Sequence, residues 1–338
     1  MLPDVLPQPG TALAAPVRRR PRWAHGLGQN VGLLLAAAML CASIAAYCTV
    51  YHAGQGAFPG GFELTTTVNN TMPLALAAVA QTLVVLTRGI DLSAGGIIDL
   101  ANAVAAIGLG STPGQMLGCS VLVLGVGAAC GLLNGVLVAY GRLQPILVTL
   151  ATLSIYQGLA IWVLPQPGGE VPEAYTAVLA NPDAPLSLLY VVLMALLWWG
   201  LRRTRLGVGI HAIGNDEAAA AANGIAPVRT KLLAYVLSGT CSAAAGLFLA
   251  ANATAGDATT GNRYTLTSIV AVVLGGVSLL GGRGSAVGAM MGAFVTTMIV
   301  NVLFFAHIDP LYQSFYEGLF LLLAVLLAGG AGRLLRRV

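Results

Sequence analysis

Charged residues are scarce in this 338-residue sequence: Asp, Glu, Lys and Arg together account for only 8% of it. A soluble domain carries about 25% of such residues. At the same time 57% of the chain is hydrophobic, which is more apolar surface than a soluble fold of this size can bury in one core. A soluble class is therefore excluded, and an integral membrane protein is indicated.

The residue patterns of common catalytic sites are also missing. The chain has no GxxxxGK[ST] loop, so it cannot bind and split ATP by that route, and it has no HExxH motif. The four histidines are scattered, and the five cysteines lie in apolar runs without metal-ligand spacing: Cys41, Cys48, Cys119, Cys130 and Cys241. We therefore predict a protein that is not an enzyme and that holds neither a cofactor nor a metal ion.

Long apolar runs dominate what the sequence does contain. A helix needs about 20 apolar residues to cross the hydrocarbon layer, which predicts an all-α polytopic membrane protein with about ten transmembrane helices. The expected spans are 31–51, 68–88, 91–110, 116–139, 145–164, 186–201, 231–252, 266–281, 285–306 and 314–331. They form one transmembrane domain, 31–332, between a disordered basic tail, 1–30, and a short basic tail, 333–338.

The few basic residues are distributed unevenly over these spans. With the N-terminus inside, every Lys and Arg except Arg263 falls in a tail or loop on the cytoplasmic side. Basic loops are retained in the cytoplasm, so both termini are expected on the cytoplasmic side of the membrane. The formal net charge of +4 is spread over short loops, which gives no reason to expect a nucleic-acid partner.

The longest cytoplasmic loop, 202–230, has a helix signal of its own. Asn215 or Asp216 can cap a short helix that continues to Ala222, and Gly224 can end it. Such a helix between two spans is either a rigid contact for a partner or an ordinary structured loop, and the pattern alone leaves both open.

A faint internal repeat is also present. Gly89–Gly95 (GIDLSAG) is similar in pattern to Gly276–Gly282 (GVSLLGG), and both segments are expected at cytoplasmic turns. The similarity suggests two weakly related parallel halves, a common way to build a transporter.

Polar residues inside the expected spans are few. Each would cost free energy facing lipid, so each should face the bundle interior or a water-filled path, and neutral amides suit the hydroxyls of a sugar. The alternative is that they only hydrogen-bond between helices. These polar residues are Asn69 and the candidates for a translocation path, which are Asn70, Gln81, Asp99, Asn102, Asn134, Gln157, Asn301 and Glu317.

Several motifs together resemble one family, the permease subunits of sugar ATP-binding cassette importers of the ribose, xylose, arabinose and galactose type. The similar segments run in the family's order over about residues 65–330. They are GIDLSAG at 89–95, LNGVLV at 133–138, PILVTL at 145–150, LSI at 153–155, RTRLG at 203–207, AIGN at 212–215 with Gly224-Ile225, AVVLGGVSL at 271–279 and GGRGS at 281–285.

The resemblance implies a dimer of permease subunits, the same or paralogous, carrying two cytoplasmic ATPase subunits and fed by a periplasmic sugar-binding protein. On this basis the loop 202–230 is expected to couple ATP hydrolysis to transport. The residues expected to take part are Asn215, Asp216, Glu217, Ala218, Gly224 and, at the glycine-rich turn, Arg283.

Four residues depart from the family pattern. Arg88 stands where glycine is usual, Asp99 where a small apolar residue is expected, Ala221 where arginine is frequent and Glu317 where lysine is common. These departures leave the solute open. They also keep an alternative in view, an ion-coupled secondary transporter that uses Asp99 and Glu317.

Overall fold

The computed structural model describes residues 22–309 and, beyond them, residues 312, 315, 316, 318, 319, 322, 323 and 326, with side chains described from residue 31 onward. Most of the expected tenth span 314–331, the candidate Glu317 and the tail 333–338 lie outside the described residues, as does 1–21 of the N-terminal tail.

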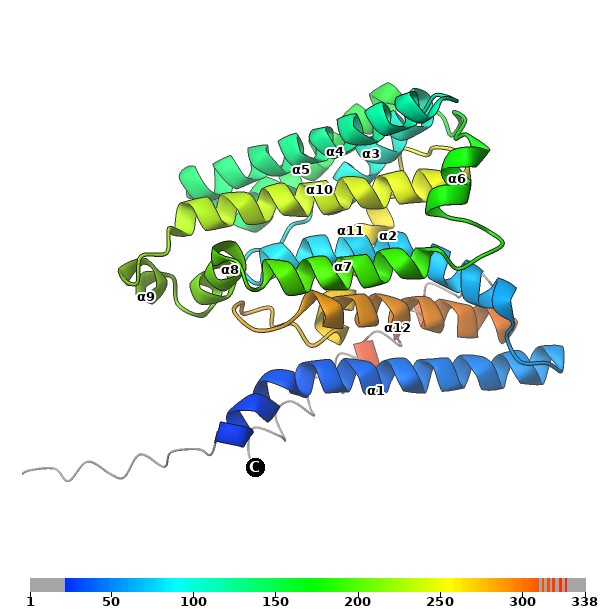
Figure 1. The fold of residues 1–338 in the computed structure, drawn as a ribbon, viewed down its shortest axis with the longest axis horizontal. Helices are drawn as coiled ribbons and strands as arrows, with labels where there is room; N and C mark the ends of the chain where they lie inside the picture. Colours follow the sequence, from blue (N-terminus) through cyan, green and yellow to red (C-terminus); the bar gives the residue numbers. More distant parts are fainter. Residues whose placement is uncertain are drawn as a thin grey trace, which may run out of the picture.

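Helices form the described part of the chain almost throughout (Figure 1). In order they are α1 (Arg22–Gln55), α2 (Gly61–Val85), α3 (Ala94–Gly108), α4 (Pro113–Gly135) with a π-helical end η1 (Val136–Tyr140), α5 (Pro145–Val163), α6 (Glu173–Leu179), α7 (Ser187–Leu201), α8 (Arg205–Asn215), α9 (Glu217–Ala222), α10 (Pro227–Ala253), α11 (Asn262–Leu274) and α12 (Ala286–Phe305). Among these residues the only β-type pairing is the isolated bridge Gly168–Gly256. The all-α prediction is confirmed.

Within the described residues, six helices are long and apolar enough to cross a membrane: α1, α2, α4 with η1, α5, α10 and α12. Three of them begin at a proline, namely Pro113, Pro145 and Pro227. Proline favours the first helical position because its missing N–H would be unpaired there in any case. The polytopic membrane class is thus confirmed, while the count of ten spans stays a prediction.

The predicted span 91–110 is longer than the helix the structure forms. α3 has only 15 residues, about 22 Å at 1.5 Å per residue, whereas the hydrocarbon layer is about 30 Å thick. The segment before it is irregular because the carboxylate of Asp91 accepts from the backbone N–H of Ser93 at 3.0 Å, a local contact that competes with helix formation.

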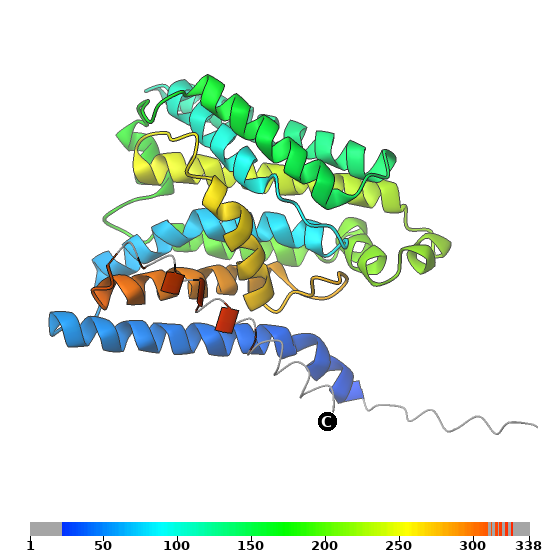
Figure 2. The same cartoon turned by 180° about the vertical axis from the view of Figure 1, so that it is seen from behind.

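The other short helices are α7, with 15 residues, and α11, with 13 residues in place of the predicted 266–281. α11 ends at Leu274 because glycines follow it, and Gly276 adopts a positive φ of 73° that favours glycine. It runs obliquely across the bundle in Figure 2. Hydropathy alone could not show that the helix ends inside the predicted span, because the glycine-containing segment that follows α11 is as apolar as the helix itself.

α2, α3 and α10 form the interior, and most of α2 is buried. α1 lies at the edge of the bundle against α12 (Figure 1). Glycines allow the closest crossings: a Cβ on Gly127 of α4 would lie 2.5 Å from the carbonyl oxygen of Gly239 of α10. Such small-residue contacts are typical of helix packing in membranes.

The two ends of the bundle differ in charge. The turn after α2, the turn after η1, the segment with α8 and α9, and the turn before α12 lie at one end, on the left of Figure 1. We call it the basic end, because it carries every described Lys and Arg side chain except Arg263: Arg88, Arg142, Arg202, Arg203, Arg205, Arg229, Lys231 and Arg283. The opposite end carries Glu63, Glu170, Glu173, Asp183 and Asp257. The basic residues that the sequence places in separate loops are therefore gathered at one end of the folded bundle.

Candidate functional site

The segment between α7 and α10 contains the expected short helix, α9. The backbone N–H of Ala219 donates to Asp216 Oδ1 at 2.9 Å, so Asp216 rather than Asn215 is its cap. Gly224, with φ of 83°, follows the helix and reverses the chain. This geometry confirms the local structure that the capping pattern predicted.

The sequence interpretation missed the helix that precedes it, α8. Thr204 caps α8 by accepting from the backbone N–H of Gly207 at 3.2 Å. Its buried side chains, Ile210 and Ile213, are 0% and 1% exposed and lie three residues apart on one face of a helix. A threonine cap followed by apolar residues at this spacing was the signal that could have found it.

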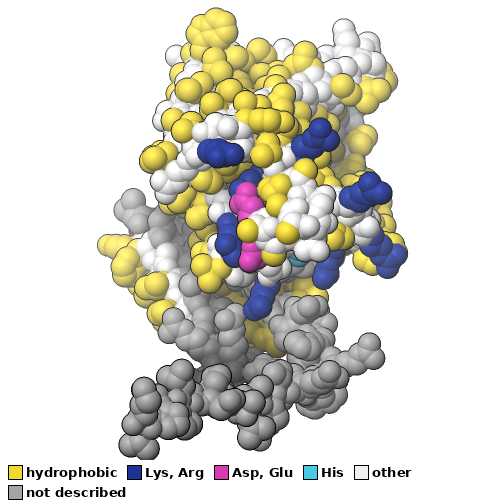
Figure 3. Space-filling view, turned by 90° about the vertical axis from the view of Figure 1, so that its left-hand side faces the viewer, with side chains coloured by type: hydrophobic (Ala, Val, Ile, Leu, Met, Phe, Trp, Pro, Cys, Tyr) yellow, Lys and Arg dark blue, Asp and Glu magenta, His cyan; other side chains and the backbone are white. Residues whose placement is uncertain are grey.

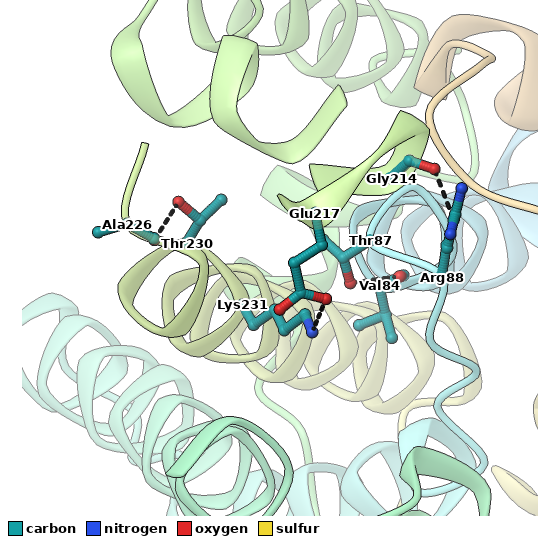
Figure 4. A network of polar contacts seen from close by, with 8 residues as sticks. All are labelled: Val84, Thr87, Arg88, Gly214, Glu217, Ala226, Thr230 and Lys231. Atoms are coloured by element: carbon teal, nitrogen blue, oxygen red, sulfur yellow. Dashed lines mark hydrogen bonds and ion pairs between the residues drawn. The ribbon is translucent and has the colours of Figure 1, made fainter. Parts of the chain in front are cut away.

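The C-terminal end of α8 is tied to the turn that follows α2. Arg88 donates through Nε to the carbonyl oxygen of Gly214 at 2.8 Å and through Nη2 to that of Asn215 at 2.6 Å. Figure 4 shows its guanidinium pointing toward Gly214. Carbonyl oxygens at a helix C-terminus have no partner within the helix, and a guanidinium is a suitable donor for them.

The glycine-rich turn before α12 joins the same contact. The backbone N–H of Gly282 donates to the carbonyl oxygen of Leu86 at 3.0 Å, and Asn215 Nδ2 donates to the carbonyl oxygen of Gly282 at 3.3 Å. Gly214 fits between the two turns, since a Cβ there would lie 1.8 Å from Leu86 O and 2.4 Å from Gly282 N. Two segments that the family resemblance singled out, 212–215 and 281–285, thus meet the turn that precedes a third, 89–95. We call this connected unit the α8 junction: residues 86–88, 214–215 and 281–282.

α9 projects from the α8 junction with its polar residues exposed. Asp216, Glu217, Ala218 and Gly224 are all exposed, as is Arg283. Glu217 pairs with Lys231 of α10 at 2.7 Å (Figure 4). An exposed ion pair contributes at most about 1 kcal/mol, so this one orients α9 more than it stabilises the fold. Figure 3 looks onto this end and shows a small acidic spot with Lys and Arg side chains around it.

A fully buried polar cluster lies around the irregular segment between α2 and α3. The centre is Asp91, which accepts from Ser93 Oγ at 2.6 Å and from Ser238 Oγ at 3.2 Å. Asn134 Nδ2 donates to Ser93 Oγ at 2.7 Å. The side-chain amide of Gln81 pairs with the backbone of Asp91. Its NH2 group donates to the carbonyl oxygen at 2.9 Å, and its oxygen accepts from the N–H at 3.3 Å.

The sequence interpretation chose Gln81 and Asn134 from this cluster and passed over Asp91. An acidic residue at the start of an expected span was the signal that could have identified Asp91. In the structure, the hydrogen bonds of Gln81 and Asn134 hold the segment between α2 and α3 in place, because backbone groups outside a helix need partners inside a membrane.

Asp99 and Asn102 lie one turn apart on α3 and hold the segment between α10 and α11. Asn102 Oδ1 accepts from the backbone N–H of Asp257 at 2.7 Å, and Asp99 Oδ1 accepts from that of Gly261 at 2.5 Å. Asp99 Oδ2 is buried without a hydrogen-bond partner among the described residues. The approach is close, since a Cβ on Gly261 would lie 2.6 Å from Asp99 Oδ1. We call this contact the α3 clamp.

The remaining candidates are dispersed. Asn70 accepts from Asn252 Nδ2 at 3.0 Å, and Asn301 Nδ2 donates to Thr67 Oγ1 at 3.0 Å. Asn69 donates to the carbonyl oxygen of Asn181 and accepts from Ser187, while Gln157 is half-buried. Among the described residues, most of the predicted path residues therefore form separate contacts between elements and do not converge on one pocket. Their role in a translocation path stays a prediction.

Comparison with known proteins identifies the family. A family profile described as "Branched-chain amino acid transport system / permease component" matches residues 64–328. The chain belongs to this permease family. The ribose import permease protein RbsC of Escherichia coli K12 is 34% identical over 278 residues, which cover 78% of this chain and 84% of RbsC.

Two further permeases are similar over the same extent. The autoinducer 2 import system permease protein LsrC of Enterobacter sp. strain 638 is 36% identical over 275 residues, and LsrC of Klebsiella pneumoniae is 36% identical over 273 residues. Each alignment covers 78% of this chain and 78% of the relative. No solved structure matches the chain. The resemblance to sugar importer permeases is confirmed, and the α8 junction and the α3 clamp both lie within the matched permease region.

Proposed function

We propose that this permease is the membrane-spanning subunit of an ATP-binding cassette importer and forms the translocation path for a monosaccharide or a similar small polar solute. The support is the similarity to permeases named for the import of ribose and autoinducer 2. In this proposal ATP is hydrolysed by separate partner subunits, and a periplasmic binding protein delivers the solute.

The observation that carries the proposal is the α8 junction. α9 is an exposed helix of six residues, and the helix before it is tied by hydrogen bonds to the turn after α2 and to the turn before α12. A partner that pushes on α9 therefore acts on the ends of two buried helices at once. Nucleotide binding in the partner could select between two arrangements of the bundle in this way.

This assignment orients the molecule. The basic end faces the cytoplasm, where two ATPase subunits would contact α9 through Asp216, Glu217 and Ala218, beside Gly224 and Arg283. The acidic end, with α6 and the segment 165–185, would meet the binding protein. A second permease subunit, the same or paralogous, completes a transporter in the bacterial inner membrane.

The relatives favour this proposal over an ion-coupled transporter. All of the relatives compared above are named as import permeases. In addition, one carboxylate oxygen of Asp99 accepts a hydrogen bond from the backbone N–H of Gly261. Asparagine could make the same contact, so the structural role of Asp99 needs no coupled ion.

The test is reconstitution of the chain in proteoliposomes, alone and with its ATPase and binding protein. We expect solute uptake only when both partners and ATP are present, and no uptake by the chain alone under a proton or sodium gradient. Uptake driven by the gradient alone would overturn the proposal. A thermal-shift screen of the binding protein against monosaccharides then identifies the solute.

A further inference from the structure

A cleft of ≈ 560 Å³ opens at the basic end, beside α9. Its walls come from the turn after α2, from η1 and the turn that follows it, from the first three turns of α10, and from Glu217 of α9. The permease function proposed above assigns no role to the cleft. The residues that matter for its chemistry are Arg88, Arg142, Lys231, Glu217, Tyr235 and Gly89.

The cleft carries an excess of positive charge, because three cationic side chains and one carboxylate line it. Lys231 gives one of its three donors to Glu217, and Arg88 uses two of its five for the α8 junction. Arg142 is exposed and makes neither a hydrogen bond nor an ion pair within the described chain. The cleft therefore offers several N–H donors and a full guanidinium that no protein acceptor occupies.

The floor of the cleft adds a different donor. Tyr235 is 1% exposed, and its hydroxyl has no hydrogen-bond partner among the described residues. This hydroxyl lies beside Gly89, where a Cβ would approach it to 3.0 Å. Buried tyrosine hydroxyls usually have a partner. An acceptor entering the cleft would supply the missing one.

We propose that the cleft binds a phosphate-bearing ligand, with the phosphate oxygens accepting from Arg142, Lys231 and the hydroxyl of Tyr235. A phosphate group matches this donor set because a guanidinium fork binds two of its oxygens at once, while an ammonium acts as a point charge. No carboxylate other than Glu217 lines the cleft, and that one is neutralised by Lys231.

The same chemistry can come from two sources. One is the headgroup of an anionic phospholipid in the adjacent leaflet, since Leu143 lines the cleft and is 51% exposed, where an acyl chain could pack. The other is a soluble phosphate ester in the cytoplasm. In both cases the ligand meets Arg88, Glu217 and Lys231, which fix the position of α9, so occupancy of the cleft can alter how α9 is presented to a partner.

Binding is measured on the purified full-length chain without its partners, so the result does not depend on whether it transports a sugar. For the soluble source, glycerol 3-phosphate is titrated into the protein in neutral detergent and followed by calorimetry. For the lipid source, phosphatidylglycerol is titrated into protein held in phosphatidylcholine nanodiscs, and bound lipid is counted by native mass spectrometry. The variants are Arg142→Gln and Tyr235→Phe, and the control is Arg229→Gln, an exposed cation of α10 outside the cleft.

We expect at least one probe to bind the parent chain. Affinity should fall about tenfold in Arg142→Gln, which removes the charged two-donor fork, and severalfold in Tyr235→Phe, which removes one hydrogen bond to a charged acceptor. Arg229→Gln should stay within about twofold of the parent, since it alters only screened surface charge. The probe that binds shows whether the ligand is a soluble phosphate ester or a lipid headgroup. Absence of binding in both arms overturns the proposal, and so does binding that Arg142→Gln and Arg229→Gln weaken equally.

Discussion

Arg88 and Asn215 are 127 positions apart in the chain and are joined by a hydrogen bond of 2.6 Å from Arg88 Nη2 to the carbonyl oxygen of Asn215. Arg88 makes this contact from a left-handed backbone conformation with φ of 65°. A non-glycine residue pays about 1–2 kcal/mol for that conformation, and a glycine would not. The glycine that the resemblance leads us to expect at this position would avoid this strain. Arg88 carries the strain and has a side chain that reaches α8.

Substitution of Arg88 separates these two effects. Arg88→Gly loses the guanidinium contacts, worth about 1.5–3 kcal/mol for bonds from a charged group, but removes the backbone strain, so we expect little change in the free energy of unfolding. Arg88→Ala loses the contacts and keeps the strain, and should lower the thermal unfolding midpoint clearly. Both variants should reduce the uptake obtained per ATP hydrolysed in the reconstituted complex. Equal stability of the two variants would contradict the role assigned to the positive φ.

Gly214 tests the packing of the α8 junction. A Cβ there would lie 1.8 Å from Leu86 O and 2.4 Å from Gly282 N. Both are backbone atoms, which cannot move aside without shifting a turn. We expect Gly214→Ala to destabilise the protein by about 1–3 kcal/mol, typical of overpacking, and to uncouple transport. Gly200→Ala in α7 is the matched control, because nothing lies within 4 Å of its added Cβ. Thermal unfolding in detergent compares them, and similar midpoints would argue against a tight junction.

Glu217 tests α9 as the contact for an ATPase. Glu217→Arg replaces an ion pair with repulsion toward Lys231, but the lost pair is exposed and worth less than about 1 kcal/mol. Membrane insertion and thermal stability should therefore persist, while ATP hydrolysis no longer drives uptake. Glu217→Gln removes the charge without adding the opposite one, and should have the smaller effect. Unchanged uptake in the Arg variant would show that coupling does not run through this residue.

The sequence predicts most elements whose cause is local, although α8, with its local Thr204 cap, was missed. It cannot predict contacts whose cause is distant. Six long apolar helices, the Asp216 cap and the gathering of basic residues at one end follow from runs, caps and charges that adjacent residues encode. The partner of Arg88 could not be predicted, because it depends on a turn and a helix end that only the folded bundle brings together. The shortness of α3 likewise depends on Asp91, whose carboxylate is held by Ser238, 147 positions away.

Asn102 tests whether the α3 clamp is structural. Asn102→Ala leaves the backbone N–H of Asp257 without its acceptor at 2.7 Å, which should cost about 1–3 kcal/mol. The segment between α10 and α11 is also held by the bridge between Gly168 and Gly256, so it should loosen rather than unfold. Faster amide hydrogen exchange confined to residues 254–261 is the expected readout. Exchange that is unchanged there would mean that the bridge and the bond from Gly261 to Asp99 hold the segment without Asn102.

Asp99 discriminates between the clamp and the ion-coupled alternative. Asp99→Asn keeps an oxygen to accept from Gly261 N–H, now 2.5 Å from Asp99 Oδ1, and loses only the charge. Asp99→Leu has no acceptor and a larger side chain, so a buried N–H is left unpaired and the close contact with Gly261 is disturbed as well. A structural clamp therefore predicts that the Asn variant keeps both ATP-driven uptake and thermal stability, and that the Leu variant loses part of both. A site for a coupled proton or sodium ion predicts that both variants lose uptake, because an amide can neither release a proton nor balance a cation. Uptake assays on the two variants in the same reconstituted complex decide between these outcomes.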